Sequence, residues 1–365
     1  ETTTVEYDKV GNAVRVQDPL GYSAYYRFDD LNRNIAMTNA VLATSYYRFD
    51  ANGNRTASVD PRGNTTYYEF DRLNRQSIMK DALEKVTSSY YDGSGNAVLV
   101  LNARGYAEYY RFDGINRRIA VTNANLETQY FGYERNYQIG VVRDPRGNLT
   151  YYSYDKVGRR TQVKDALSGL WTSVYDADGR MTASEDARGL RSYYTFDKAN
   201  RRTVFTDTVG SSEYYFYDSA GNIVRKVDPR SALCYYAFDA VGRKTLENRE
   251  IDAGTFASMT STYDARGQIT RVIDQRGYPS YFRFDEISRQ IEVKDALLQV
   301  TSSAYDAANN LVLRTNARNY SSYFRFDALN RLAASTNPLL ETIYFGYDQV
   351  GNQTTTKDPR GQTWT

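Results

Sequence analysis

Histidine is absent from this chain of 365 residues, and cysteine occurs once, at Cys234. The first absence excludes Ser-His-Asp and Cys-His catalysis and His-ligated metal sites; the second excludes intrachain disulfides and thiolate metal clusters. No apolar run approaches the roughly 18 residues of a membrane span, and no signal-peptide pattern opens the chain. The chain also lacks an excess of positive or negative charge, with 46 Lys and Arg against 44 Asp and Glu, so we expect no nucleic-acid partner.

Tyrosine is abundant, with 35 residues, and a Tyr/Phe-Asp dipeptide returns every 21 residues. One step of 25 residues interrupts this spacing, which places a four-residue insertion near 250–256. Glu134 marks one copy, and the other markers, which we interpret as structural repeat positions, are Asp8, Asp29, Asp50, Asp71, Asp92, Asp113, Asp155, Asp176, Asp197, Asp218, Asp239, Asp264, Asp285, Asp306, Asp327 and Asp348. Residues 1–365 therefore form a single array of about seventeen repeats.

Each copy has the pattern of a β-hairpin. Residues 65–70 are β-branched and aromatic, as strands prefer, and residues 71–75 follow with an Asp and an Asn suited to a type I turn with a bulge. A second strand comes next, such as 97–101, and the return turn often reads Asp-Pro-Arg-Gly, as in 60–63. No helical periodicity competes. We predict an all-β fold in which the hairpins join into one continuous superhelical sheet, a β-shell or tube.

The motif Tyr-Asp-x-x-Gly-Asn/Arg, as in 154–159 and 217–222, followed by Asp-Pro-x-Gly at 21-residue spacing, resembles the YD-repeat or RHS-repeat family. The resemblance covers the whole chain. It implies a large secreted or surface protein whose hairpins coil into a hollow shell, as in bacterial polymorphic toxins, insecticidal toxin complexes, wall-associated proteins and teneurins. No plug, autoproteolytic aspartyl segment or toxin domain of such proteins is recognisable among these residues.

A longer rhythm of 84 residues suggests two widths for the coil. Most copies carry an aromatic pair before the marker, such as Tyr25-Tyr26. Polar or small pairs replace it in repeats 1, 5, 9 and 13, and the rhythm then slips by two repeats: Thr4-Val5, Ser88-Ser89, Thr172-Ser173, Thr260-Ser261 and Ser302-Ser303. If one turn held four hairpins, its eight strands would close a narrow tube filled with Tyr and Phe. If the turn is wider, the interior stays open and the rhythm records duplication.

Alternative roles exist for the repeated side chains. The tyrosine columns are either a carbohydrate platform or a structural ladder on the sheet face; we favour the ladder, with Tyr68 and Phe70 on one face and Tyr67 and Glu69 on the other. The acidic markers resemble calcium ligands. An arginine nevertheless follows many of them by four residues, and pairing would satisfy the charges without metal: Arg33, Arg75, Arg117, Arg159, Arg201, Arg243, Arg289 and Arg331.

We expect no catalytic residue, metal or cofactor, because identical repeats lack the asymmetry that an acid–base pair requires. The leading hypothesis is a secreted or surface structural protein that forms a fibre or shell wall, and the resemblance implies a bacterial origin. The alternatives are a toxin container with an encapsulated effector and a glycan-binding adhesion module. Bare sheet edges need partners, so we expect a fragment of a longer array that meets further repeats or like subunits end to end.

Overall fold

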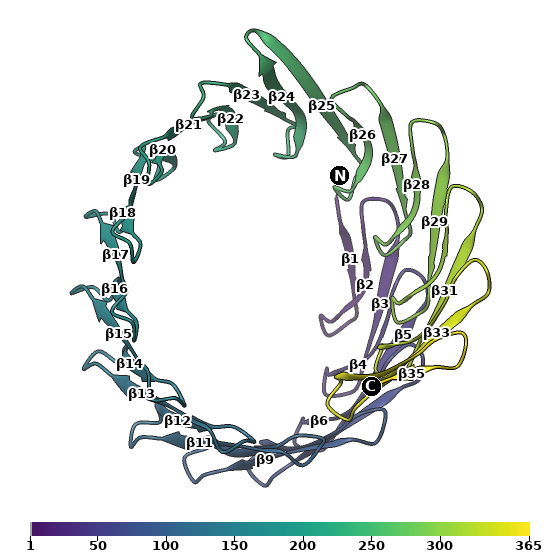
Figure 1. The fold of residues 1–365 in the computed structure, drawn as a ribbon. Helices are drawn as coiled ribbons and strands as arrows, with labels where there is room; N and C mark the ends of the chain where they lie inside the picture. Colours follow the sequence, from purple (N-terminus) through teal and green to yellow (C-terminus); the bar gives the residue numbers. More distant parts are fainter. Residues whose placement is uncertain (1) are drawn as a thin grey trace.

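The computed structural model describes residues 2–365, and throughout this range the regular structure is β-strand. Thirty-five strands form one sheet in which each strand pairs antiparallel with its sequence neighbours. Figure 1 shows that the sheet winds into a ring and then overlaps itself. The prediction of an all-β, continuous superhelical sheet of hairpins is therefore confirmed.

The strands are of two kinds, the first and the second strand of each hairpin. The first strands, mostly six residues long, are β1 (Thr4–Tyr7), β3 (Ser23–Phe28), β5 (Thr44–Phe49), β7 (Thr65–Phe70), β9 (Val86–Tyr91), β11 (Ala107–Phe112), β13 (Thr128–Tyr133), β15 (Leu149–Tyr154), β17 (Leu170–Tyr175), β19 (Arg191–Phe196), β21 (Ser212–Tyr217), β23 (Leu233–Phe238), β25 (Thr255–Tyr263), β27 (Pro279–Phe284), β29 (Val300–Tyr305), β31 (Ser321–Phe326), β33 (Thr342–Tyr347) and β35 (Thr363–Trp364). The second strands, mostly five residues long, are β2 (Ala13–Gln17), β4 (Asn34–Thr38), β6 (Arg55–Val59), β8 (Gln76–Lys80), β10 (Ala97–Leu101), β12 (Arg118–Thr122), β14 (Ile139–Arg143), β16 (Arg160–Lys164), β18 (Met181–Glu185), β20 (Arg202–Thr206), β22 (Ile223–Val227), β24 (Lys244–Asp252), β26 (Ile269–Ile273), β28 (Gln290–Lys294), β30 (Leu311–Thr315), β32 (Leu332–Thr336) and β34 (Gln353–Lys357).

Two kinds of turn lie on opposite edges of this sheet. The YD turns carry the acidic markers and close the hairpins β1–β2, β3–β4 and so on, and they form the YD edge; the return turns, such as the one between β2 and β3, form the return edge. In the YD turn at Asp71, the Asn74 N–H donates to the Asp71 carbonyl over 3.0 Å, and Asn74 has a φ of 60°. The register slips by one residue at Glu69/Phe70. The predicted type I turn with a bulge is thus present.

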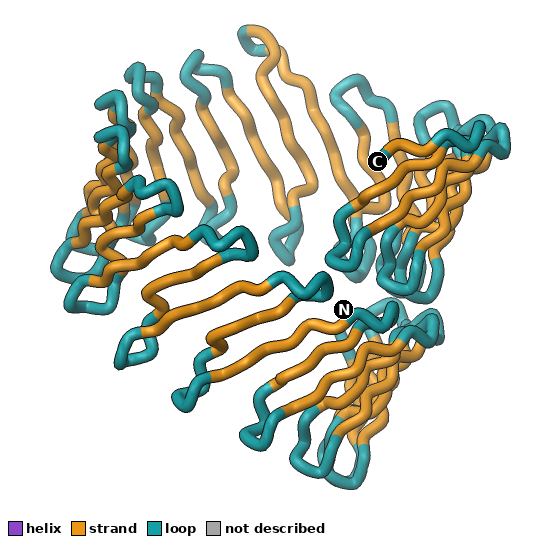
Figure 2. Tube along the Cα trace, turned by 60° about the horizontal axis from the view of Figure 1, so that its bottom comes forward, coloured by secondary structure: helices purple, strands orange, loops and turns teal. Residues whose placement is uncertain are grey.

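The width of the coil follows from contacts between its successive turns. The return turn between β2 and β3 meets the YD turn between β25 and β26, through Asp18 and Arg266. The return turns after β6 and β10 likewise meet the YD turns after β29 and β33. In all three contacts the two turns that meet are 23 strands apart along the chain, so one turn of the coil contains 23 strands. The number is odd because return turns follow even-numbered strands and YD turns follow odd-numbered ones, and the return edge of one turn of the coil rests on the YD edge of the next. Figure 2 shows the two layers, with the C-terminal hairpins stacked on the N-terminal ones.

The hypothesis of a narrow tube with eight strands in each turn and an aromatic-filled interior is wrong. In the single-layer wall, strands such as β7 alternate between exposed residues (Tyr67, Glu69) and half-buried ones (Tyr68, Phe70), in agreement with the predicted faces. Among residues 2–365 the buried apolar side chains are alanines and Cys234. Large side chains on both faces oppose tight bending, because those on the concave face would collide. The 84-residue rhythm therefore does not correspond to a turn of the coil.

The longest hairpin lies where the sequence places its insertion. β24 and β25 have nine residues each and pair as far as Asp252 and Thr255, so the insertion lengthens the hairpin at the return edge. Figure 1 shows this hairpin projecting beyond its neighbours. The extension leaves the YD edge unchanged, and the regular pairing resumes at once with β26.

Candidate functional site

The aspartate of each YD turn is held by its own turn. At Asp197, Oδ1 accepts the backbone N–H of Ala199 and of Arg201, over 2.9 and 3.0 Å, and Oδ2 accepts the Arg201 Nε–H over 2.7 Å. The eight predicted Asp–Arg pairs all form, and a ninth, Asp176 with Arg180, joins them. The carboxylates are therefore occupied by the chain itself.

The same arginines also join each hairpin to the next one. Arg201 donates from Nη1 to the carbonyl of Asp218 over 2.8 Å, and its guanidinium lies 4.7 Å from the centre of the Tyr217 ring. The Tyr217 hydroxyl completes the link by donating to the carbonyl of Arg202 over 2.7 Å. In the copies that follow an arginine-type turn, the aromatic residue before the marker thus contacts the preceding repeat. The sequence analysis did not predict that this aromatic residue binds the preceding repeat. The sequence does contain a signal for it, because copies with Phe-Asp and a turn arginine tend to alternate with copies that have Tyr-Asp.

Copies with asparagine in place of the arginine make an equivalent link. Asn54 donates from Nδ2 both to Asp50 Oδ2, over 2.9 Å, and to the side-chain oxygen of Asn74 in the next YD turn, over 2.8 Å. Asn12, Asn96 and Asn310 repeat this arrangement. A chain of hydrogen bonds consequently runs along the YD edge.

These bonds shift the ionisation of the markers. The amide of Asn12 lowers the pKa of Asp8, and the guanidinium of Arg33 lowers that of Asp29, because both hydrogen bonds favour the charged carboxylate. Within residues 2–365, no group of three or more acidic or cysteine side chains is placed to hold a metal ion. A stabilising role of the markers in the sheet remains our interpretation.

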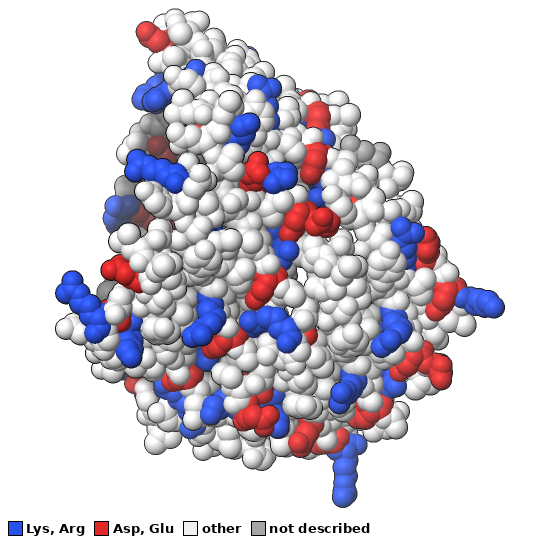
Figure 3. Space-filling view, turned by 90° about the vertical axis from the view of Figure 1, so that its right-hand side faces the viewer, with Lys and Arg blue, Asp and Glu red and all other residues white. Residues whose placement is uncertain are grey.

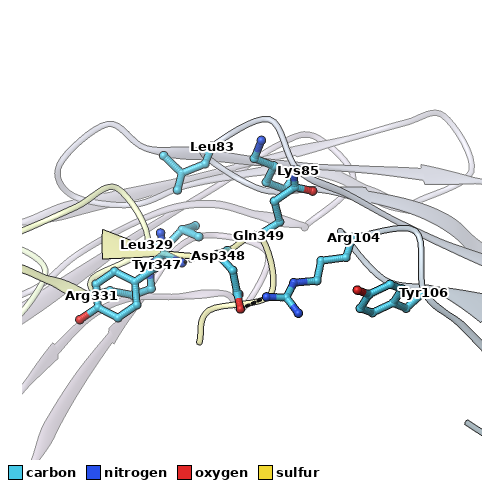
Figure 4. A pocket seen from close by; sticks show the side chains of 9 residues that line it. All are labelled: Leu83, Lys85, Arg104, Tyr106, Leu329, Arg331, Tyr347, Asp348 and Gln349. Atoms are coloured by element: carbon cyan, nitrogen blue, oxygen red, sulfur yellow. Dashed lines mark hydrogen bonds and ion pairs between the residues drawn. The ribbon is translucent and has the colours of Figure 1, made fainter. Parts of the chain in front are cut away.

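A seam joins the two turns of the coil, and three arginines cross it. Arg62, in a return turn, donates to the carbonyl of Asp327 over 2.8 Å and lies 3.6 Å from Asp306. Arg104, also in a return turn, forms an ion pair with Asp348, as Figure 4 shows. Arg266 reaches from a YD turn to Asp18 over 3.6 Å and lies 5.1 Å from the centre of the Tyr22 ring.

The surroundings of the Arg104–Asp348 pair form a pocket shared by the two turns of the coil. Leu83, Lys85 and Tyr106 line it from the first turn, and Leu329, Arg331 and Tyr347 from the second. Burial opposes the lowered pKa of Asp348, but the N–H groups of Asn352 and Val350 and the charge of Arg104 prevail. Nothing in the sequence distinguishes Arg62 and Arg104 from the arginines of other return turns, so the seam was not predicted.

Near the long β24–β25 hairpin, the side-chain contacts differ from those of the other repeats. Lys226 and Glu213 form an ion pair of 2.8 Å, and the Tyr215 hydroxyl donates to Glu213. Glu250 accepts the backbone N–H of Leu233 and of Gly254, over 2.8 and 2.9 Å. Glu213, Lys226 and Glu250 line a pocket together with the buried Cys234, but both acidic groups already have partners in the chain.

The wall exposes both aromatic and charged side chains. The first tyrosine of the aromatic pairs is half-exposed, for example 46% for Tyr25 and 49% for Tyr193. On the face seen in Figure 3, basic and acidic side chains are interspersed without a large patch of one sign. No helix capable of crossing a bilayer occurs in the range that the structure describes.

The structure places the chain in the class of repeat proteins whose hairpins form one continuous, coiled β-sheet that is a single layer thick. Solved structures share it: a crystal structure of TcdB2-TccC3 matches with a TM-score of 0.84 and 14% identity, over 100% of this chain and 24% of that chain. A Photorhabdus luminescens Tc holotoxin pore matches with a TM-score of 0.80 and 14% identity, over 100% of this chain and 23% of that one. The chain thus spans about a quarter of these neighbours. No family model and no curated protein sequence matches. The likeness shows a common fold.

Proposed function

We propose that this chain is a non-enzymatic wall segment of a secreted bacterial shell that encloses a guest polypeptide. The observation that carries the proposal is the 23-strand turn of the coil, together with the absence of any large, fully buried side chain among residues 2–365. A filled fibre needs an aromatic core, but the first tyrosine of each aromatic pair is half-exposed here, as at Tyr25 and Tyr193.

The dimensions suit a guest chain. At about 4.8 Å per strand, 23 strands give a perimeter of about 110 Å and a diameter of about 35 Å. Side chains extend about 5 Å from a sheet, which leaves about 25 Å across. A helix with its side chains is about 10–12 Å wide, so the lumen accommodates an extended or helical polypeptide.

The solved neighbours support the proposal by analogy. They are chains of toxin assemblies by their descriptions, TcdB2-TccC3 and a Tc holotoxin pore. At 14% identity the shared fold supports, by analogy, a role of this chain as part of a shell wall. The analogy does not identify the guest polypeptide. Secretion and a bacterial source belong to the proposal in the same way.

Protease protection tests the proposal. The protein is isolated in its native secreted form and treated with a protease, and peptides from outside residues 1–365 are followed by mass spectrometry. A guest inside the shell survives, and the same segment produced alone is degraded. Equal degradation in both samples would contradict encapsulation, whereas small-angle scattering without a central deficit of density would contradict the hollow wall itself.

A glycan-binding role is the second candidate, and the half-exposed tyrosine column favours it. Exposed aromatic faces such as those of Tyr25, Tyr109 and Tyr193 are available for sugar stacking. Titration with soluble polysaccharides should then change tyrosine fluorescence, and Tyr109→Ala with Tyr193→Ala should reduce that change. An unaltered signal at saturating polysaccharide would leave the column as a structural ladder.

A further inference from the structure

The pocket at the Arg104–Asp348 pair lies where one return turn of the seam lacks an arginine. Arg62 and Arg104 stand third in their return turns and reach across to the YD turns of the second turn of the coil. Leu83 holds the same place in the return turn between β8 and β9, and residues 81–85 contain no arginine. A pocket of about 490 Å³ lies beside this turn. Its volume is in the range of small-molecule sites.

Both turns of the coil supply the walls of this seam pocket. The return turns after β8 and β10 line it from the first turn, and the YD turns after β31 and β33 line it from the second. Leu83 and Leu329 provide apolar side chains, and the guanidinium of Arg104 lies 5.7 Å from the centre of the Tyr106 ring. Figure 4 shows Arg104 between this ring and Asp348. A ligand in the pocket therefore contacts elements that already face each other across the seam.

Positive charge exceeds negative charge in the lining of the pocket. Lys85, Arg104 and Arg331 line it, and Asp348 is the one acidic side chain among the residues that do so. Arg331 is also paired with Asp327, outside the lining. One positive charge remains even when Asp327 is counted, and it belongs to Lys85.

Several hydrogen-bond donors in the pocket are left over. Lys85 is half-buried, and its ammonium neither donates a hydrogen bond to, nor forms an ion pair with, any of residues 2–365. Arg104 uses Nη2 for Asp348, and its Nε and Nη1 have no acceptor in the same range. The Oδ1 atom of Asp348 already accepts the N–H groups of Val350 and Asn352, each over 2.9 Å. Because removing a cation from water is costly unless an anion pairs with it, these donors favour an anionic ligand.

We propose that the seam pocket binds a small organic oxyanion. Its carboxylate or phosphate group accepts hydrogen bonds from Lys85 and Arg104, since a guanidinium fork matches the paired oxygens of either group. Its apolar part packs against the Tyr106 ring, and Leu329 and Gln349 contact it from the second turn of the coil. The ligand thereby adds to the arginine contacts that hold the two turns together. The proposal goes beyond the role of the chain as a wall and does not depend on a guest in the lumen.

Isothermal titration calorimetry of the purified protein at constant ionic strength tests the site. Phenyl phosphate and benzoate are the probes, and neutral benzyl alcohol is the control ligand. We expect one equivalent of at least one anion to bind, and the tighter of the two identifies the preferred head group. Benzyl alcohol should bind at least about tenfold more weakly, because it cannot pair with Lys85.

Substitutions assign the binding to the pocket. Lys85→Met should weaken it by about tenfold or more, and Lys85→Arg should retain most of the affinity, because it keeps a charged donor. Arg104→Gln removes the second donor and should weaken binding as well, with circular dichroism to show that the sheet is intact. The matched control is Lys156→Met, which removes an exposed lysine from the YD turn after β15, outside the pocket, and should leave the affinity unchanged.

Amide hydrogen exchange shows whether the ligand contacts both turns of the coil. The bound probe should slow exchange in residues 81–85 and in residues 327–331 together, and leave residues 8–12 unchanged. Three results would overturn the proposal: no binding of either anion, undiminished binding in both Lys85→Met and Arg104→Gln, or slowed exchange on one turn of the coil alone. None of them would alter the protection of a guest from protease, so this site and the proposed shell function are tested separately.

Discussion

The two edges of the sheet use one turn geometry for different purposes. At Asp60 in a return turn and Asp71 in a YD turn, the same backbone hydrogen bonds close the loop, and an aspartate accepts N–H groups two and four residues later. On the YD edge, Arg75 then reaches the next repeat by donating to the carbonyl of Asp92 over 3.0 Å. Return turns are closed within themselves, as in the Thr38–Thr44 hydroxyl pair at 2.8 Å.

This difference explains which edge tolerates change. Return turns vary from Asp-Pro-Arg-Gly at 60–63 to Asp-Ala-Leu-Leu at 295–298, and one of them contains the insertion. YD turns carry Arg or Asn at their end in most copies, because that side chain binds the neighbouring hairpin. The YD edge holds successive hairpins together, and the return edge is left to meet other layers.

Acid should break the YD edge most strongly. The pKa of its aspartates, such as Asp8, Asp29 and Asp197, is lowered by hydrogen bonds, so the folded state favours their charged form. Stability from these groups is complete above the ordinary pKa near 3.8 and is lost as the pH falls through the lower folded values, because the unfolded chain then binds more protons. Thermal unfolding followed by circular dichroism from pH 6 to about pH 2.5 should show a steep fall in the midpoint below about pH 4. A flat profile would mean that the markers contribute little.

A matched pair of substitutions compares the edges at single residues. Asp197→Ala removes two backbone acceptor bonds and the anchor of Arg201, which then loses its position against Asp218 and Tyr217. Asp207→Ala in the next return turn removes two backbone bonds, from Val209 and Ser211. The urea midpoint should fall further for the YD-turn variant, with faster amide exchange in both hairpins that meet there. Equal effects would contradict a special role of the YD edge.

The tyrosine link should have a smaller effect. Tyr217→Phe deletes the hydroxyl that donates to the carbonyl of Arg202 and leaves the ring under Arg201, so we expect a loss of about 1 kcal/mol in unfolding free energy. Tyr214→Phe, at a half-exposed position of the same strand, should change stability by less than about 0.5 kcal/mol. Denaturant titration of both variants measures the difference. A loss at Tyr214 as large as that at Tyr217 would show that the hydroxyl bond is not the cause.

The sequence allows the hairpins, their turns and the Asp–Arg pairs to be predicted because each is decided within a few residues. Asp71 and Arg75, for example, are neighbours in one turn, and the backbone bonds of that turn place them together. The link from Arg75 to Asp92 was missed, because it requires the registration of two successive hairpins.

The width of the coil and the contacts of its seam could not be predicted from residues that are close in sequence. The width of the coil is the sum of small rotations over 23 strands, and a small change in each rotation would bring different turns together. Arg62 and Arg146 stand in the same Asp-Pro-Arg-Gly context, yet Arg62 crosses the seam and Arg146 is exposed. Side-chain identity alone therefore could not show which arginines are covered.

The return edge also retains backbone strain, and relieving it gives the smallest predicted effect. Leu126 has a φ of 63° and is 77% exposed, whereas the following return turn has Gly147 at a φ of 89° with open space around it. Left-handed backbone costs a residue with a Cβ about 1–2 kcal/mol, and glycine loses about 0.5–1 kcal/mol of unfolded-state entropy. Leu126→Gly should therefore stabilise the protein by about 0.5 kcal/mol, and Gly147→Leu should destabilise it by at least as much. Denaturant midpoints of the two variants measure both signs; a loss of stability in Leu126→Gly would instead indicate that the exposed leucine packs against another layer, as the return edge does at the seam.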